Sequence, residues 1–110
     1  MLVVDDDQSL RLLCRVNLEL DGFEVTEARN LDDARAALEG IDAVLLDVHV
    51  GAENGIELLD ELKRDRPDLP VVLLTGESGL PPEARGRADA VLSKPFEIGD
   101  LTETMARLVA

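Results

Sequence analysis

The chain has little aromatic character, few basic residues and a single cysteine. Among its 110 residues there are no Trp and no Tyr, and only two Phe. One Cys cannot form an internal disulfide, which fits a reducing compartment. Without Trp or Tyr there is no aromatic platform on which single-stranded nucleic acid could stack. The formal net charge of −13 argues against direct nucleic-acid binding, because nucleic-acid sites are basic.

Long apolar runs are also missing. No run approaches the roughly 20 residues that span a bilayer, and Asp5–Asp7 interrupts any hydrophobic region of a signal peptide. The chain has no basic amphipathic helix for a membrane surface either. We therefore expect a cytoplasmic protein without a membrane partner. Its length and its 45% hydrophobic content suit one modest core, so we expect a single domain over residues 1–110.

Short apolar runs, each followed by helix-like sequence, predict parallel strands buried on both faces. These four runs are Leu2–Val4, Ala43–Leu46, Val71–Leu74 and Val91–Ser93. A fifth strand with alternating character is expected at Glu24–Ala28, and Val48–Asn54 is expected to be a loop. Helices are expected over residues 8–20, 56–64, 82–87 and 98–109, and between an Asn30 cap and Gly40. The predicted architecture is a doubly wound, three-layer α/β sandwich.

The first expected helix carries two apolar lines. Leu10, Leu13, Cys14 and Leu18 follow helical spacing and are predicted to face the core. A second line consists of Leu12, Val16 and Leu20. This second line is either a docking surface for a partner or partly buried against the C-terminal helix.

Polar residues stand where the apolar runs end. Asp5 and Asp6 follow the first strand, Asp47 ends another, Thr75 follows a third and Lys94 a fourth. In an open α/β sheet the ligand site lies outside the carboxyl ends of the strands, so we expect these side chains to converge. Carboxylates that close raise one another's pKa unless a cation intervenes, and Mg²⁺ is the natural partner. The bland alternative is a solvated acidic loop.

A hydroxyl and an ammonium beside the acids indicate that an anion also binds. Lys94 is one of only two Lys among eleven basic residues, and a point charge of this kind suits phosphate. The Lys94–Pro95 bond can be cis at modest cost, which would direct the lysine back over the sheet. An Asp can act as nucleophile and form an aspartyl phosphate. Asp47 is the best candidate, since it ends the most central run.

Four segments of the chain resemble the receiver domains of two-component response regulators. They are Val3–Asp7, Leu45–Asp47 with Gly55 eight residues on, Val72–Gly76 and Lys94–Phe96. The four occur in the family's order, and the resemblance covers the whole chain. It implies a flavodoxin-like (βα)5 fold with a five-stranded parallel sheet of strand order 2-1-3-4-5. It also implies a signalling role in a bacterial phosphorelay.

The resemblance assigns a role to each acid. Asp47 matches the phosphoacceptor, Asp6 the direct Mg²⁺ ligand, and Asp5 its partner, which often acts through water. His49 matches the position whose backbone carbonyl binds Mg²⁺. The phosphoryl donor would be a phosphohistidine on a sensor histidine kinase or a histidine phosphotransfer protein.

Further positions match residues that respond to the phosphoryl group. Thr75 matches the switch hydroxyl and Lys94 the phosphate-pairing lysine. Side chains at the positions of His49 and Glu77 tune how fast family members lose the phosphoryl group, although a solvated loop histidine is an equal alternative for His49. Val91 stands where the family often has a switch aromatic.

Other departures concern the output of the switch. Gly51 stands where the family usually has Pro, and the fourth helix looks curtailed by about one turn. That face usually dimerises or binds an output module, so an unusual output follows as a hypothesis. A homodimer and a fused or separate output domain both stay open.

Three readings compete. The first is a phosphorylatable receiver, a signalling domain rather than an enzyme, with at most self-catalysed phosphotransfer and autodephosphorylation. The second is a pseudo-receiver that binds a partner without using phosphorylation. The third is a small phosphatase of the haloacid type, but such enzymes want a second Asp two residues after the nucleophile, and here that residue is His49.

Overall fold

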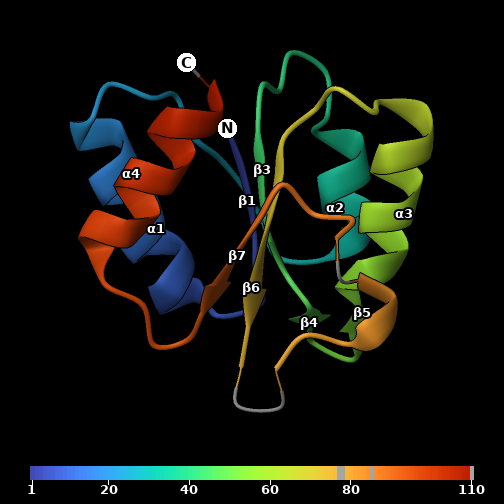
Figure 1. The fold of residues 1–110 in the computed structure, drawn as a ribbon. Helices are drawn as coiled ribbons and strands as arrows, with labels where there is room; N and C mark the ends of the chain where they lie inside the picture. The colour runs from blue at the N-terminus through green and yellow to red at the C-terminus, as the bar shows by residue number, and fades with distance from the viewer. Residues whose placement is uncertain (77–78, 85, 110) are drawn as a thin grey trace.

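The computed structural model describes residues 1–76, 79–84 and 86–109 of the chain (Figure 1). Its centre is a five-stranded sheet in the order β2-β1-β3-β6-β7, with every neighbouring pair parallel. The strands are β1 (Leu2–Val4), β2 (Thr26–Ala28), β3 (Val44–Asp47), β6 (Val71–Thr75) and β7 (Ala90–Ser93). Counted within this sheet, the order is the expected 2-1-3-4-5.

Helices cover both faces of the sheet. Figure 1 shows α1 (Gln8–Leu20) and α4 (Ile98–Val109) on one side, and α2 (Leu31–Ala36) and α3 (Gly55–Asp65) on the other. The Asp7 and Asn30 side chains accept hydrogen bonds from the first turns of α1 and α2, as expected of N-caps. The three-layer, doubly wound sandwich is confirmed.

The sheet divides the interior into two apolar clusters. Val44 and Leu46 of β3 pack in the cluster with α2 and α3, whereas Leu45 packs in the cluster with α1 and α4. The strands β1, β3 and β6 are buried throughout, because each has a neighbouring strand on both sides and helices on both faces. Cys14 lies fully buried in the second cluster, which confirms it as a core residue.

The fourth apolar run differs from its prediction. Alternate residues of β7 are exposed rather than buried, and Val91 is 41% exposed. Only β6 pairs with β7 among the described strands, so β7 is an edge strand with one poorly covered face. The predicted helix over residues 82–87 is instead the short 3-10 helix Pro82–Ala84. Gly86, at φ +76°, adopts a left-handed conformation that does not continue a helix.

The predicted loop after Asp47 contains a small hairpin. The strands β4 (His49–Val50) and β5 (Glu53–Asn54) pair antiparallel. Gly51, at φ +63°, begins the two-residue turn between them, a position that favours glycine. A Glu53 carboxylate oxygen accepts a hydrogen bond from the Leu31 amide at 3.2 Å, which ties the hairpin to the start of α2.

The faces of α1 were predicted only in part. Cys14 and Leu18 are buried, but Leu13, expected in the core, is 46% exposed. The second line, Leu12, Val16 and Leu20, is 56%, 47% and 78% exposed, which favours the docking-surface alternative over burial against the C-terminal helix. The arc that α1 buries is narrower than its apolar spacing suggests, because α1 rests on the sheet and on α4 along one side only.

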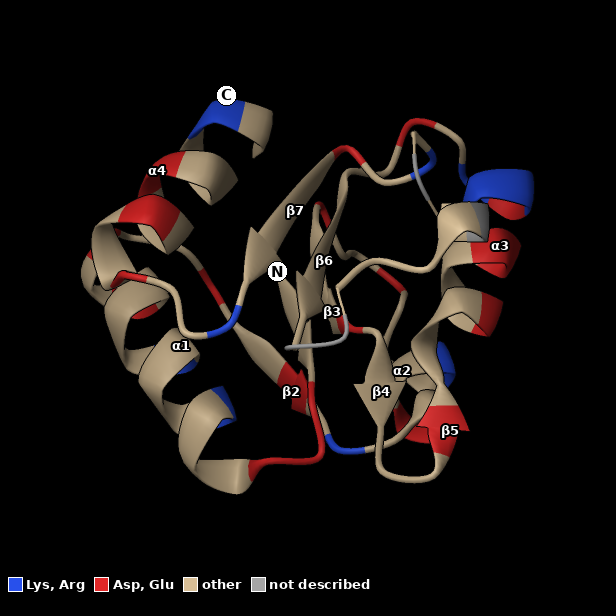
Figure 2. Cartoon of the chain, turned by 60° about the horizontal axis from the view of Figure 1, so that its bottom comes forward, with Lys and Arg blue, Asp and Glu red and all other residues tan. Residues whose placement is uncertain are grey.

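Acidic residues occur over helices on both sides of the sheet, and Figure 2 shows them on α3 and α4 alike.

None of the helices in residues 1–76, 79–84 and 86–109 is long and apolar enough to cross a membrane.

Candidate functional site

Three carboxylates gather at the carboxyl ends of β1 and β3. The two strands are neighbours, with Val4 in register with Leu46, so the residues that follow them meet at one edge of the sheet. One oxygen each of Asp5, Asp6 and Asp47 lies within 4.8 Å of the others. Asp5 and Asp47 are buried, at 1% and 6% exposure, whereas Asp6 is exposed. We call this cluster the acidic pocket.

The Lys94 ammonium reaches the acidic pocket from the end of the edge strand β7. Lys94 follows β7, and its Nζ lies 2.6 Å from Asp47 Oδ2 and 3.1 Å from Asp5 Oδ2. The Lys94–Pro95 peptide bond is cis. The Lys94 amide donates to the Thr75 carbonyl at 2.7 Å. Thr75 is buried at the end of β6, which lies between β3 and β7.

The other candidate residues differ in how they relate to the acidic pocket. The His49 amide donates to Asp47 Oδ1 at 3.0 Å, and its side chain is exposed. Val91 lies on β7 and is exposed. Glu77 falls outside the residues that the structure describes.

Burial and charge together set the protonation of the acidic pocket. Burial and, to a lesser extent, the Asp47 carboxylate raise the pKa of Asp5 to about 6, although the Asp7 amide and Lys94 oppose this. Burial lowers the pKa of Lys94, but hydrogen bonds with Asp47 and Asp5 outweigh burial, so its pKa is raised overall. One ammonium among three carboxylates leaves uncompensated negative charge.

The donor set of the acidic pocket fits Mg²⁺. All three candidate ligands are carboxylate oxygens, and the cluster contains no His or Cys. Mg²⁺ prefers hard oxygen ligands and uses one or two carboxylates together with water and phosphate oxygens. The exposed Asp6 gives the pocket an open side for those additional ligands.

Two backbone contacts hold the acids in place. The Asp7 amide donates to Asp5 Oδ1 at 2.9 Å, which orients the Asp5 carboxylate. On the other strand, the Gly55 amide donates to the Val48 carbonyl at 2.7 Å. A Cβ built on Gly55 would overlap the Asp47 carbonyl oxygen. The start of α3 therefore lies directly against the backbone of Asp47, and only glycine fits there.

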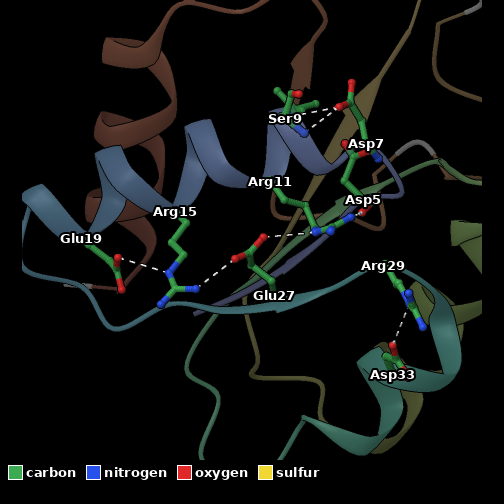
Figure 3. A network of polar contacts seen from close by, with 10 residues as sticks. Asp5, Asp7, Ser9, Arg11, Arg15, Glu19, Glu27, Arg29 and Asp33 are labelled. Atoms are coloured by element: carbon green, nitrogen blue, oxygen red, sulfur yellow. Dashed lines mark hydrogen bonds and ion pairs between the residues drawn. The ribbon is translucent and has the colours of Figure 1, made fainter.

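One residue at the site was missed by the sequence reasoning. Arg11 Nη1 donates to the Asp5 carbonyl at 2.6 Å (Figure 3). The signal that could have found it is a basic residue in the early part of the helix that follows the acids. Arginine is common on exposed helix faces, so this signal is weak without the coordinates.

Comparison with known proteins identifies the family. The model of the response regulator receiver domain matches residues 1–106. The chain belongs to the response regulator receiver family. It is therefore a receiver domain of two-component response regulators, a signalling domain, as the four motifs predicted.

Relatives and solved structures agree with this assignment. The chain is 36% identical over 117 residues to the phosphate regulon transcriptional regulatory protein PhoB of Pseudomonas aeruginosa, covering all of this chain and 50% of PhoB. It is 33% identical over 106 residues to the uncharacterized transcriptional regulatory protein YkoG of Bacillus subtilis, covering 92% of this chain and 46% of YkoG. The chain thus spans about half the length of these regulators.

The fold is also that of solved receivers. The receiver domain of NtrX from Brucella abortus superposes with a TM-score of 0.91 at 33% identity, covering 98% of this chain and 96% of that one. A CheY-like receiver domain from Methanospirillum hungatei gives a TM-score of 0.88 at 28% identity, covering 98% and 90% of the two chains.

The raised pKa of Asp5 makes a prediction about stability and pH. A carboxyl group whose pKa is about 6 in the folded protein and 3.8 ordinarily binds its proton more tightly when folded. The metal-free protein should therefore lose stability as the pH rises from about 4 to about 6, by on the order of 2 kcal/mol. Urea unfolding in a chelator across this range measures the loss. Asp5→Asn should remove it, and an unchanged slope in that variant would contradict the assignment.

Proposed function

We propose that this receiver accepts a phosphoryl group on Asp47 from a histidine-containing donor and switches an output partner. The donor is a sensor histidine kinase or a histidine phosphotransfer protein. The observation that carries the proposal is the position of the Asp47 carboxylate. It lies within 4.8 Å of two further carboxylates and 2.6 Å from the Lys94 ammonium.

The transfer needs little chemistry from the protein. As an Asp47 carboxylate oxygen forms a bond to phosphorus, the bond between phosphorus and the donor's imidazole nitrogen breaks, and the product is an acyl phosphate. Lys94 would offset negative charge on the transferred group, and Thr75, buried at the end of β6, would donate its hydroxyl to a phosphoryl oxygen. Mg²⁺, when bound by Asp5, Asp6 and Asp47, supplies further charge neutralisation.

The remaining assignments belong to this proposal as well. The His49 carbonyl is the expected backbone ligand of Mg²⁺. The side chains of His49 and Glu77 are the expected tuners of phosphoryl loss. Val91 replaces the family's switch aromatic, so the output should respond to another element.

The lengths of the relatives suggest what this domain works with. We assign residues 1–110 to one receiver domain. The matched regulators are about twice as long, and their names describe transcriptional regulation. A fused or separate output module, or a second receiver, is therefore the expected partner of the phosphorylated state.

A mass measurement tests the proposal. The protein incubated with Mg²⁺ and acetyl phosphate should gain one phosphoryl group, and the gain should disappear in a chelator. Asp47→Ala should gain none, whereas Asp33→Asn, a change at an exposed acid on α2, should behave like the native chain. No adduct on the native chain would favour a pseudo-receiver. Turnover of phosphomonoesters would instead favour a phosphatase.

A further inference from the structure

Arg11 holds the backbone of a metal-binding acid. It lies on α1, its side chain is only 12% exposed, and Nη1 donates to the Asp5 carbonyl oxygen at 2.6 Å (Figure 3). A hydrogen bond from a charged donor is stronger than one between neutral groups. The hydrogen bonds of Arg11 go to the Asp5 carbonyl and to Glu27, not to the carboxylate of Asp5 or Asp47. Arg11 can therefore affect the position of the acids only through the main chain of Asp5.

The contact replaces a missing partner of the sheet. The Asp5 amide still pairs with the Ala28 carbonyl, at 3.1 Å, on the side of β2. However, β2 ends at Ala28, and the next backbone donor of a parallel ladder would have to come from beyond it. Arg11 supplies a donor to the Asp5 carbonyl at this place. The backbone just after β1, at Asp5, is thus held by a hydrogen bond from a residue of α1.

Glu27 holds the guanidinium of Arg11 and also accepts a hydrogen bond from a second arginine. Glu27, in the middle of β2, accepts from Arg11 Nε at 3.2 Å with one oxygen and from Arg15 Nη1 at 3.0 Å with the other. Arg15 Nε in turn pairs with Glu19 at 3.3 Å. Glu27 is in register with Val3 of β1. The Arg11–Glu27 pair therefore connects α1 to the edge strand β2. Arg11 is therefore tied to β1, to β2 and to its own helix.

We propose that Arg11 is a positioning residue for the metal site, setting the place of the Asp5 and Asp6 carboxylates through the Asp5 carbonyl. This inference rests on the proposed function, because it assumes that these acids bind Mg²⁺. Partners that orient metal ligands without touching the metal commonly change metal affinity by 10- to 100-fold when they are removed. Arg15 shares Glu27 with Arg11, but its hydrogen bonds described above go to Glu27 and Glu19 and not to the Asp5 carbonyl. It is therefore a matched control.

Calorimetric titration with Mg²⁺ tests the proposal on metal-free protein. Arg11→Met keeps most of the side-chain stem and removes the donors, and it should weaken Mg²⁺ binding by about tenfold or more. Arg15→Met should bind Mg²⁺ as the native chain does. Urea unfolding of both variants in a chelator shows how much stability each loses. Arg11→Met should also need more Mg²⁺ to reach half-maximal phosphorylation by acetyl phosphate, while its rate at saturating Mg²⁺ stays close to native.

The outcomes separate this inference from the function on which it rests. If the native chain takes up no Mg²⁺ and no phosphoryl group, the proposed function itself fails. If the native chain binds Mg²⁺ and Arg11→Met binds it equally well, only the role of Arg11 is refuted. Equal weakening by Arg11→Met and Arg15→Met would also refute it, since the network would then act through stability alone. Should Arg11→Met not fold, Arg11→Lys, with fewer donors, is read against Arg15→Met in the same way.

Discussion

Replacing Gly55 by alanine should destabilise the protein by roughly 2–3 kcal/mol and slow the phosphorylation of Asp47. The added methyl would overlap the Asp47 carbonyl oxygen and press on the Val48 carbonyl. Both are backbone atoms that cannot rotate away, so either α3 or the end of β3 must move. Such a shift displaces Asp47, the proposed phosphoacceptor. Urea unfolding measures the first effect, and the rate of mass gain with acetyl phosphate measures the second.

Gly99 provides the control for this experiment. It lies near the start of α4, and a Cβ added there meets nothing within 4 Å. Gly99→Ala should therefore raise stability by up to about 1 kcal/mol through helix propensity alone, and leave the phosphorylation rate unchanged. Opposite signs for two identical substitutions would show that space beside Asp47 decides the outcome. A neutral Gly55→Ala would mean that α3 does not press on the backbone of Asp47.

Replacing Lys94 by methionine should destabilise the metal-free protein at neutral pH by on the order of 2 kcal/mol. The ammonium pairs with both Asp5 and Asp47, and its loss leaves two buried carboxylates facing each other. Two conditions should reduce this penalty. One is bound Mg²⁺, which takes over the neutralisation. The other is a pH below about 6, where Asp5 becomes protonated. Urea unfolding with and without Mg²⁺ at the two pH values measures each effect.

The second lysine of the chain is the matched control. Lys63 lies on α3, and its Nζ contacts Asp89 Oδ2 at 2.6 Å and the Leu69 carbonyl at 3.0 Å. Asp89 precedes β7, at the opposite end of that strand from Lys94. Lys63→Met should also cost stability, but by the same amount with and without Mg²⁺. If Mg²⁺ fails to rescue Lys94→Met, the ammonium and the metal do not share the same acids.

The sheet and the acidic pocket were predictable because both depend on short-range patterns. Short uninterrupted apolar runs rich in β-branched residues and Leu, such as Val44–Leu46, favour strands buried on both faces. Once those strands are parallel neighbours, the residues after them must meet at one edge. This is why the sequence alone groups Asp5, Asp47 and Lys94, although they are separated by up to 89 residues.

The errors arose where the structure depends on contacts across the fold or on a local backbone conformation that the sequence leaves open. The spacing of Leu13 suggested burial, but the width of the buried arc of α1 depends on how α1 sits against the sheet and α4. The 3-10 helix Pro82–Ala84 is shorter than its sequence suggested because Gly86 takes a left-handed conformation. Arg11 escaped notice because its acceptor is a main-chain carbonyl, for which no residue type provides a signal.

The hydrogen bond from the His49 amide to Asp47 Oδ1 has a practical consequence for spectroscopy. His49 is the sole histidine of the chain. Isotopically labelled histidine would therefore produce one backbone amide resonance, and that resonance would belong to the amide that donates to Asp47, the proposed phosphoacceptor. Its chemical shift would follow Mg²⁺ uptake and phosphorylation of the carboxylate in real time, without a fluorophore and without assigning the rest of the spectrum.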